Sequence, residues 1–204
     1  MAAEPVHVLK ALSVLLQYPG PEVREAAAEV EPGALEGATR RQSRRIAAFL
    51  GWFRSRPAAE LERAYVETFD FGRRQSLHLT YHEHGDRRQR GLAMLRLKQA
   101  YASAGFEPSG TELPDYLPLM LEFAALGGEP GRSLLAGQRV SLELVRAAAR
   151  DEQSPYAELL DAVADALPGL TRRQLARVRR LAAEGPPSEQ VGLEPFAPPE
   201  VMPT

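Results

Sequence analysis

Apolar residues recur at helical spacing along almost the whole chain, and this periodicity constrains the fold more than any other feature. Val8, Leu9, Leu12, Leu15 and Leu16 form the first apolar stripe, which the Pro19-Gly20-Pro21 segment ends. The same pattern predicts helices at about 5–17, 21–31, 41–53, 57–69, 86–105, 113–126, 132–150, 155–167 and 171–183. We therefore expect an all-α protein, a single bundle of about eight or nine helices.

Residues 71–85 are the least regular stretch of the chain. Leu77, Leu79 and Tyr81 alternate as they would in a strand, but a lone strand has no pairing partner elsewhere in this sequence. A loop or a helical turn is therefore the better interpretation. Asp86 then fits the N-cap of the next helix, because Gln89 follows it three residues later.

The length of 204 residues suits one medium-sized domain with a core of its own. Six prolines follow residue 185, and a segment of that composition does not form a regular helix. We expect a helical domain at 1–184 and a poorly ordered, Pro-rich tail at 185–204.

Composition excludes several classes of function. The chain contains no cysteine, which excludes disulfides, thiolate metal sites and cysteine nucleophiles. A net charge of -2 argues against nucleic acid as a partner. The N-terminus lacks the basic region of a signal peptide, and no run approaches the roughly 20 apolar residues that cross a bilayer. We expect a cytoplasmic protein without an integral membrane segment.

Three histidines lie close together at His78, His82 and His84. Their spacing could place two imidazoles on one helical face, as a zinc or iron site requires. Histidines that only make hydrogen bonds within a loop are the simpler interpretation, because no third-ligand motif accompanies them. We therefore assign no metal site and keep a histidine-ligated enzyme or sensor as the alternative function.

The helix expected at 113–126 is apolar around most of its circumference, so it should be central in the fold. Its remaining stripe carries Asp115, Pro118 and Glu122. The two carboxylates must meet solvent, arginines or a ligand, since burying them unpaired is costly. An internal salt-bridge network and a binding role both remain open. Without a nucleophile or a metal set nearby, the pair does not indicate an enzyme.

Arginines raise two further hypotheses. Arg87, Arg88 and Arg90 begin a helix, where the helix dipole disfavours cations, so a partner is expected. The candidates are Glu67, Asp70, Glu83, or an acidic or phosphate group on a ligand. Solvated arginines with some local carboxylate pairing are the alternative, which suits Arg87 and Arg88 better than Arg90. Gly91 inside that helix suggests that another backbone approaches closely. Separately, Arg41, Arg44 and Arg45 share one helical face, which would suit a helical transcription regulator, although the acidic balance of the chain weighs against it.

Three stretches together resemble one protein family. They are Tyr65-Val66-Glu67-Thr68-Phe69-Asp70 with Ser76-Leu77-His78-Leu79, then His82-Glu83-His84-Gly85 with Arg90-Gly91-Leu92-Ala93-Met94, and finally Glu112-Leu113-Pro114-Asp115-Tyr116-Leu117-Pro118-Leu119 with Leu121-Glu122-Phe123. In this order they are similar to the nitrate reductase molybdenum cofactor assembly chaperones, also called the delta subunit, within the redox-enzyme maturation chaperones. The resemblance covers roughly residues 5–170.

The resemblance implies an all-helical chaperone that is not an enzyme. Its relatives bind the N-terminal segment of the apo catalytic (alpha) subunit of a nitrate reductase. They hold it ready for insertion of the molybdenum–bis(molybdopterin guanine dinucleotide) cofactor, which the chaperone does not itself bind stoichiometrically. Proteins of cofactor synthesis are a further candidate partner.

The family's shared positions supply the candidate site. Candidate client-binding or partner-binding residues are Tyr65, Glu67, Asp70, His82, His84, Arg90, Asp115, Tyr116 and Glu122, and the scaffold positions are Gly85, Gly91, Leu113, Pro114 and Pro118.

Overall fold

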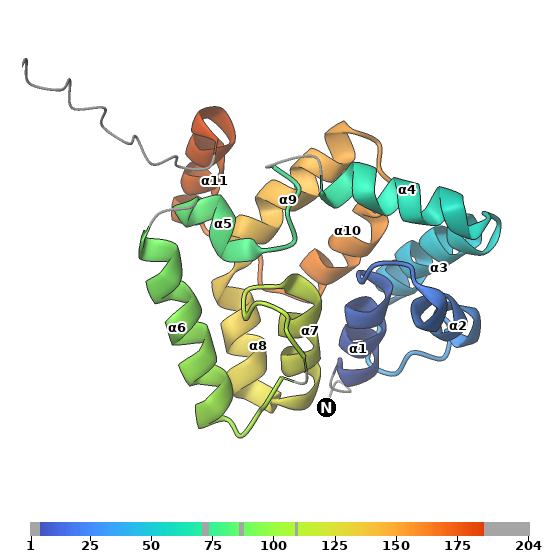
Figure 1. Ribbon diagram of the computed structural model, residues 1–204, viewed down its shortest axis with the longest axis horizontal. Coiled ribbons are helices and arrows are strands. Elements are labelled where there is room, and N and C mark those ends of the chain that lie inside the picture. The colour runs from blue at the N-terminus through green and yellow to red at the C-terminus, as the bar shows by residue number, and fades with distance from the viewer. Residues whose placement is uncertain (1–4, 71–73, 86–87, 109, 186–204) are drawn as a thin grey trace, which may run out of the picture.

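The computed structural model describes residues 5–70, 74–85, 88–108 and 110–185, and these contain eleven α-helices (Figure 1). They are α1 (Val6–Leu15), α2 (Pro21–Glu29), α3 (Arg40–Arg54), α4 (Ala58–Phe69), α5 (Leu79–His84), α6 (Arg88–Ser103), α7 (Leu117–Leu126), α8 (Gly128–Gly137), α9 (Arg139–Asp151), α10 (Ala157–Asp165) and α11 (Arg172–Glu184). No strand longer than a single bridge occurs in these ranges. The all-α prediction is confirmed.

The number of helices exceeds the expected eight or nine for two reasons. Residues 79–84 form the short helix α5, and the helix expected at 132–150 is divided into α8 and α9. The division falls at Gln138, whose backbone N–H bonds to the carbonyl of Leu135, three residues back. The tail expected after residue 185 and the predicted cap at Asp86 lie outside the described residues, as does Arg87.

Helix α7 is central, as its all-round apolar composition predicts. It packs against α1 on one side and α8 on the other (Figure 1). Its buried residues are Leu117, Pro118, Leu119, Met120, Leu121, Phe123, Ala124 and Ala125. Ser13 of α1 donates a 2.8 Å hydrogen bond to the carbonyl of Pro118, a carbonyl that the first turn of a helix can share with another element.

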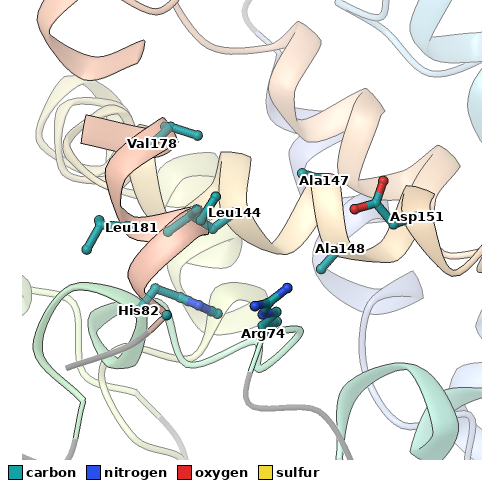
Figure 2. A pocket seen from close by; sticks show the side chains of 10 residues that line it. Arg74, His82, Leu144, Ala147, Ala148, Asp151, Val178 and Leu181 are labelled. Carbon is teal, nitrogen blue, oxygen red and sulfur yellow. The ribbon is translucent and has the colours of Figure 1, made fainter. Parts of the chain in front are cut away.

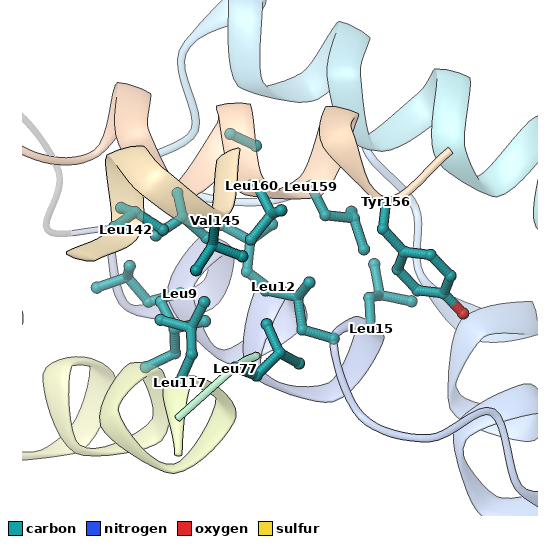
Figure 3. Close-up of a cluster of buried hydrophobic side chains, with 14 of the residues drawn as sticks. Leu9, Leu12, Leu15, Leu77, Leu117, Leu142, Val145, Tyr156, Leu159 and Leu160 are labelled. Carbon is teal, nitrogen blue, oxygen red and sulfur yellow. The ribbon is translucent and has the colours of Figure 1, made fainter. Parts of the chain in front are cut away.

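Figure 3 shows the part of the main core in which α1 meets α7, α9 and α10. Leu9, Leu12 and Leu15 of α1 point toward Leu117 of α7 and toward side chains from α9 and α10, among them Leu142, Val145, Leu159, Leu160 and Tyr156. These contacts join the N-terminal helix to segments about 130 to 150 residues later in the chain, so that the first and last thirds of the sequence share one core.

A tight corner joins α7 to α8. Gly128 has a φ of +58°, and a Cβ added at Gly131 would lie 2.2 Å from the carbonyl oxygen of Phe123. Only glycine allows the backbone of α8 to approach α7 this closely.

No helix in the described ranges is long and apolar enough to span a bilayer.

Leu12 provides a test of the shared core. It is fully buried, so Leu12→Ala should lower the free energy of unfolding by about 2–5 kcal/mol through lost burial and a residual cavity. Leu95→Ala is the matched control, because Leu95 is 51% exposed on α6 and its removal should change stability by less than about 0.5 kcal/mol. Denaturant unfolding followed by circular dichroism measures both. Equal losses would contradict the packing described.

Candidate functional site

The three stretches that resemble the family meet around one short backbone pairing. His78 and Tyr116 form an isolated antiparallel bridge. The N–H of Leu79 donates to the carbonyl of Asp115 at 2.9 Å, and the N–H of Leu117 donates to the carbonyl of Leu77 at 2.9 Å. The irregular stretch is therefore mainly a helical turn, as expected, but its entry does pair with the segment that precedes α7.

Asp115 is the centre of the polar network at this bridge, and its side chain is 0% exposed. Its carboxylate accepts hydrogen bonds from Nδ1 of His78 at 3.1 Å, from the hydroxyl of Thr80 and from the guanidinium of Arg90 at 3.3 Å. Burial acts to raise the pKa of Asp115, but the hydrogen bonds from His78 and Thr80 and the charges of His78 and Arg90 outweigh it, so the pKa lies below its ordinary value. The carboxylate thus joins the N-terminal ends of α5, α6 and α7.

Arg90 has an acidic partner, as expected, but among the described residues this partner is Asp115 and not Glu67, Asp70 or Glu83. Arg90 also lies over the ring of Tyr81 at 5.6 Å from the centroid. Glu122 pairs instead with Lys10 of α1. Asp115 and Glu122 thus both take part in ion pairs within the fold, the first buried and the second at the surface.

A pair of tyrosines connects the bridge to α4. The hydroxyls of Tyr65 and Tyr116 lie 3.0 Å apart, and that of Tyr65 also donates to the carbonyl of Leu16. Burial is the main cause that raises the pKa of Tyr65, and the neighbouring Tyr116 raises it further. The ring of Tyr116 also packs against the imidazole of His78 at 5.4 Å between centroids. His78 is 31% exposed, so this imidazole is the part of the network that reaches the surface.

His82 lies on the other side of α5 and is only 2% exposed. Its Nε2–H donates to the carbonyl of Ser76 at 2.8 Å. Burial lowers the pKa of His82, although the hydrogen bond to Ser76 acts to raise it. The lowered pKa keeps the imidazole neutral. Together with Arg74 it lines one side of a small cavity of about 80 Å³, with Val178 and Leu181 of α11 opposite (Figure 2).

The histidines do not converge on one point. Within the ranges that the structure describes, no three His, Asp or Glu side chains are arranged to hold a metal ion. His78 faces Asp115 and His82 faces a backbone carbonyl, which accounts for both imidazoles by hydrogen bonding.

The arginine face of α3 is also accounted for. Arg45 pairs with Glu158, Asp161 and Asp165 of α10 at 2.6–3.0 Å, and Arg41 pairs with Asp165. Two of the three arginines that suggested a regulator thus stabilise the packing of α3 on α10.

Two adjoining grooves flank the bridge on the surface. The first has a volume of about 490 Å³ and carries Glu22, Glu112 and Glu122 together with Tyr18 and Tyr116. The second, of about 410 Å³, is mainly apolar and is lined among others by Tyr101, Phe106, Leu113, Pro114 and Leu119. Pro108, Gly110, Glu112 and Leu119 belong to both. An acid-lined groove thus continues into an apolar one.

The remaining predicted site residues lie at several depths. Glu67 and Asp70 are exposed on α4, where Glu67 pairs with Arg63. His84 is partly buried, and Gly85 ends α5 with a φ of +56°. A Cβ added at Gly91 would meet nothing within 4 Å, so the expected close backbone approach there is wrong.

Several groove and network residues were not singled out from the sequence. Thr80, Glu22, Tyr101 and Phe106 lie outside the motif positions. Thr80 follows the recognised Leu77-His78-Leu79 by one residue, and only the folded α5 shows that its hydroxyl reaches Asp115.

With this geometry established, comparison with known proteins assigns the family. The model of the family described as "Nitrate reductase delta subunit" matches residues 33–162. The chain belongs to this family. The matched range of the delta subunit family includes the whole Asp115 network and ends within α10, so α11 lies beyond it.

The relatives of this delta subunit family member are named for nitrate reductase or for its assembly. It is 36% identical over 165 residues to the "probable nitrate reductase molybdenum cofactor assembly chaperone NarJ" of Bacillus subtilis, covering 80% of this chain and 90% of that protein. It is 32% identical over 155 residues to NarJ of Escherichia coli K12, covering 74% and 65%. It is 43% identical over 117 residues to the "nitrate reductase-like protein NarX" of Mycobacterium tuberculosis, covering 53% of this chain but 18% of that one. The resemblance stated from the motifs is confirmed.

The Asp115 network makes a prediction for stability. Asp115→Ala removes the buried carboxylate that accepts from three side chains, one of them the guanidinium of Arg90, so we expect a loss of roughly 3–5 kcal/mol in the free energy of unfolding. Glu67→Ala, at an exposed pair 3.9 Å from Arg63, should cost less than about 1 kcal/mol. Urea unfolding at pH 7 compares the two. A small loss for Asp115→Ala would rule out a central role for this carboxylate.

His82 makes a prediction for pH. Its folded pKa lies below the unfolded value of about 6.5, so the unfolded chain binds a proton first as the pH falls. The contribution of neutral His82 to the free energy of unfolding is fully present above about pH 6.5. It declines as the pH falls further, by at most about 1.4 kcal/mol per pH unit. His82→Gln can retain a donor to Ser76 but cannot titrate, so its stability should vary less between pH 7.5 and 5. His7→Gln, at an exposed histidine, should keep the wild-type slope.

Proposed function

We propose that this protein is a chaperone that binds the N-terminal segment of the apo catalytic subunit of a respiratory nitrate reductase and assists insertion of its molybdenum cofactor. The observation that carries the proposal is the pair of adjoining grooves beside the family motifs, one acidic and one apolar. The names of the relatives support the client and the cofactor. The chaperone role requires neither a catalytic residue nor a stoichiometrically bound cofactor of its own.

The grooves favour an amphipathic, basic segment. Apolar side chains of the client would lie on the partly buried Phe106 and the exposed Leu113 of the apolar groove, to whose lining the buried Leu119 also contributes. Basic side chains on its other face would approach Glu22, Glu112 and Glu122. A helix laid in a groove reads such a pattern through anchors at i, i+3, i+4 and i+7. Because Glu122 already pairs with Lys10, a client cation there would share or replace that partner.

The buried family residues support this site indirectly. Asp115 fixes His78 and the segment before α7, and Tyr65 holds the hydroxyl of Tyr116. Tyr116 is itself part of the acidic groove. We therefore assign Asp115, Tyr65 and Arg90 to positioning the groove, and Tyr116 and Glu122 to contact with the client.

The acidic groove can be tested by calorimetry with a synthetic peptide of the catalytic subunit's N-terminal segment. Glu22→Gln with Glu112→Gln should weaken binding about five- to tenfold at low salt and reduce its salt dependence, because exposed charges contribute about 0.2–1 kcal/mol each. Glu25→Gln with Glu29→Gln changes the net charge equally on an exposed face of α2 and should bind as wild type does. Unchanged affinity in the first variant would exclude this groove.

The apolar groove needs a separate variant. Leu113 is 43% exposed at its edge, so Leu113→Ser should spare the fold and weaken peptide binding by about tenfold through lost apolar contact. Leu92→Ser, at an equally exposed leucine of α6 that lines neither groove, is the control. If both variants bind the peptide like the wild type, the client lies elsewhere.

A further inference from the structure

Helix α11 is basic in a chain that is acidic overall. Its thirteen residues contain one acidic residue, Glu184, and five arginines, namely Arg172, Arg173, Arg177, Arg179 and Arg180. The complete chain is slightly acidic, with 25 basic and 27 acidic side chains. All five arginines are exposed. Helices α3 and α6 are basic too, but Arg41 and Arg45 of α3 pair with α10 and Arg90 of α6 pairs with Asp115, so these helices use part of their charge within the fold.

The fold uses only the inner face of α11. Val178 and Leu181 pack with Val140 of α9, and Leu144 and Leu170 complete this small cluster. Arg177 reaches Glu83 of α5 at 2.8 Å. The other four arginines form no ion pair within the part of the chain that the structure describes. Helix α11 lies at the edge of the molecule, where it packs on α9 (Figure 1), and these four arginines are exposed on it.

These charges work against the helix that carries them. Arg172 and Arg173 occupy the first turn, where the helix dipole disfavours cations, and no acidic residue accompanies them there. Arg173 and Arg177 repel each other at the i, i+4 spacing, as do Arg177 and Arg180 at i, i+3. The capping box of Thr171 and Gln174 already fixes the start of the helix without any charge. Local stability therefore does not explain the arginines.

We propose that the outer face of α11 docks on the surface of an anionic lipid bilayer. The arginines are spread along an exposed helix, which fits an extended negative surface better than a single small anion. The cavity that α11 lines is formed by its inner residues Val178, Leu181, Ala182 and Gly185, and none of its arginines belongs to it. Guanidinium groups bind phosphate oxygens in a bidentate manner, and basic residues near an anionic leaflet each strengthen binding.

One apolar side chain lies among these charges. Leu175 is 40% exposed, one helical turn from Arg172 and Arg179. An exposed leucine between arginines can enter the headgroup region while the cations remain at the phosphates. The protein would thus lie on the membrane without spanning it.

Docking through α11 leaves the client grooves accessible. In Figure 1 the connection between α6 and α7, which supplies Phe106 and Leu113 to the apolar groove, lies at the opposite end of the molecule from α11. A chaperone attached by α11 would present its grooves away from the bilayer. The inference therefore does not depend on the proposed client, and either can fail alone.

Vesicle co-sedimentation of the full chain tests the proposal. We expect binding to vesicles of phosphatidylcholine with one-third phosphatidylglycerol, none to phosphatidylcholine alone, and loss of binding in 0.5 M salt, because exposed charges are screened there. The variant with Arg172, Arg173, Arg179 and Arg180 each changed to Gln should lower the partition coefficient about tenfold or more. Its circular dichroism should remain that of the wild type.

A charge-matched control separates the helix from the net charge. Arg40, Arg44, Arg88 and Arg96 are exposed arginines of α3 and α6, and their joint change to Gln should leave vesicle binding within about twofold. Equal loss in both variants, or equal binding to neutral and anionic vesicles, would overturn the proposal. So would tighter binding to single-stranded RNA than to the vesicles at the same ionic strength, since this would identify a different anionic partner.

Discussion

A buried carboxylate organises the part of this molecule that carries the family motifs. Asp115 receives hydrogen bonds from His78 and Thr80 at the start of α5 and from Arg90 at the start of α6. An ion in the interior is stable only when its partners are in place, so this network requires α5, α6 and the start of α7 to adopt one arrangement together. Residues of α6 and of the segment before α7 line the two surface grooves, so the shape of the grooves depends on this network.

Much of the fold could be predicted from the sequence because helical periodicity is local. The central position of α7 followed from its apolar surface around most of the circumference, and Leu117 and Phe123 are indeed buried. The division of α8 from α9 could not be predicted, because the apolar pattern continues through Gln138 and only the packing of Leu135 and Leu142 into the core fixes the break. Helix α5 was expected only as a loop or a helical turn, because the alternation of Leu77, Leu79 and Tyr81 is also compatible with an extended chain.

The sequence could predict which residues belong to the candidate site, but not how deeply each of them is buried. Motif resemblance selected Asp115, Tyr65 and Glu122 together, although the first two are buried beneath the surface and the third lies on it. Sequence cannot distinguish these depths, because burial of a carboxylate depends on partners such as Thr80 that come from elsewhere in the fold. The arginines of α11 could have been counted at the outset, yet the structure was required to show that they are exposed and that only Arg177 among them forms an ion pair in the described ranges.

The corner at Gly131 sets a limit on how this family member can vary. A side chain at that position would overlap the carbonyl of Phe123, and the next residue available to absorb the strain is Phe123 itself, whose ring packs on Tyr101 and Phe106. Tyr101 and Phe106 line the apolar groove. A substitution at this position of α8 would therefore alter the shape of a surface that it does not line, which makes this corner a remote determinant of the groove that we propose for the client.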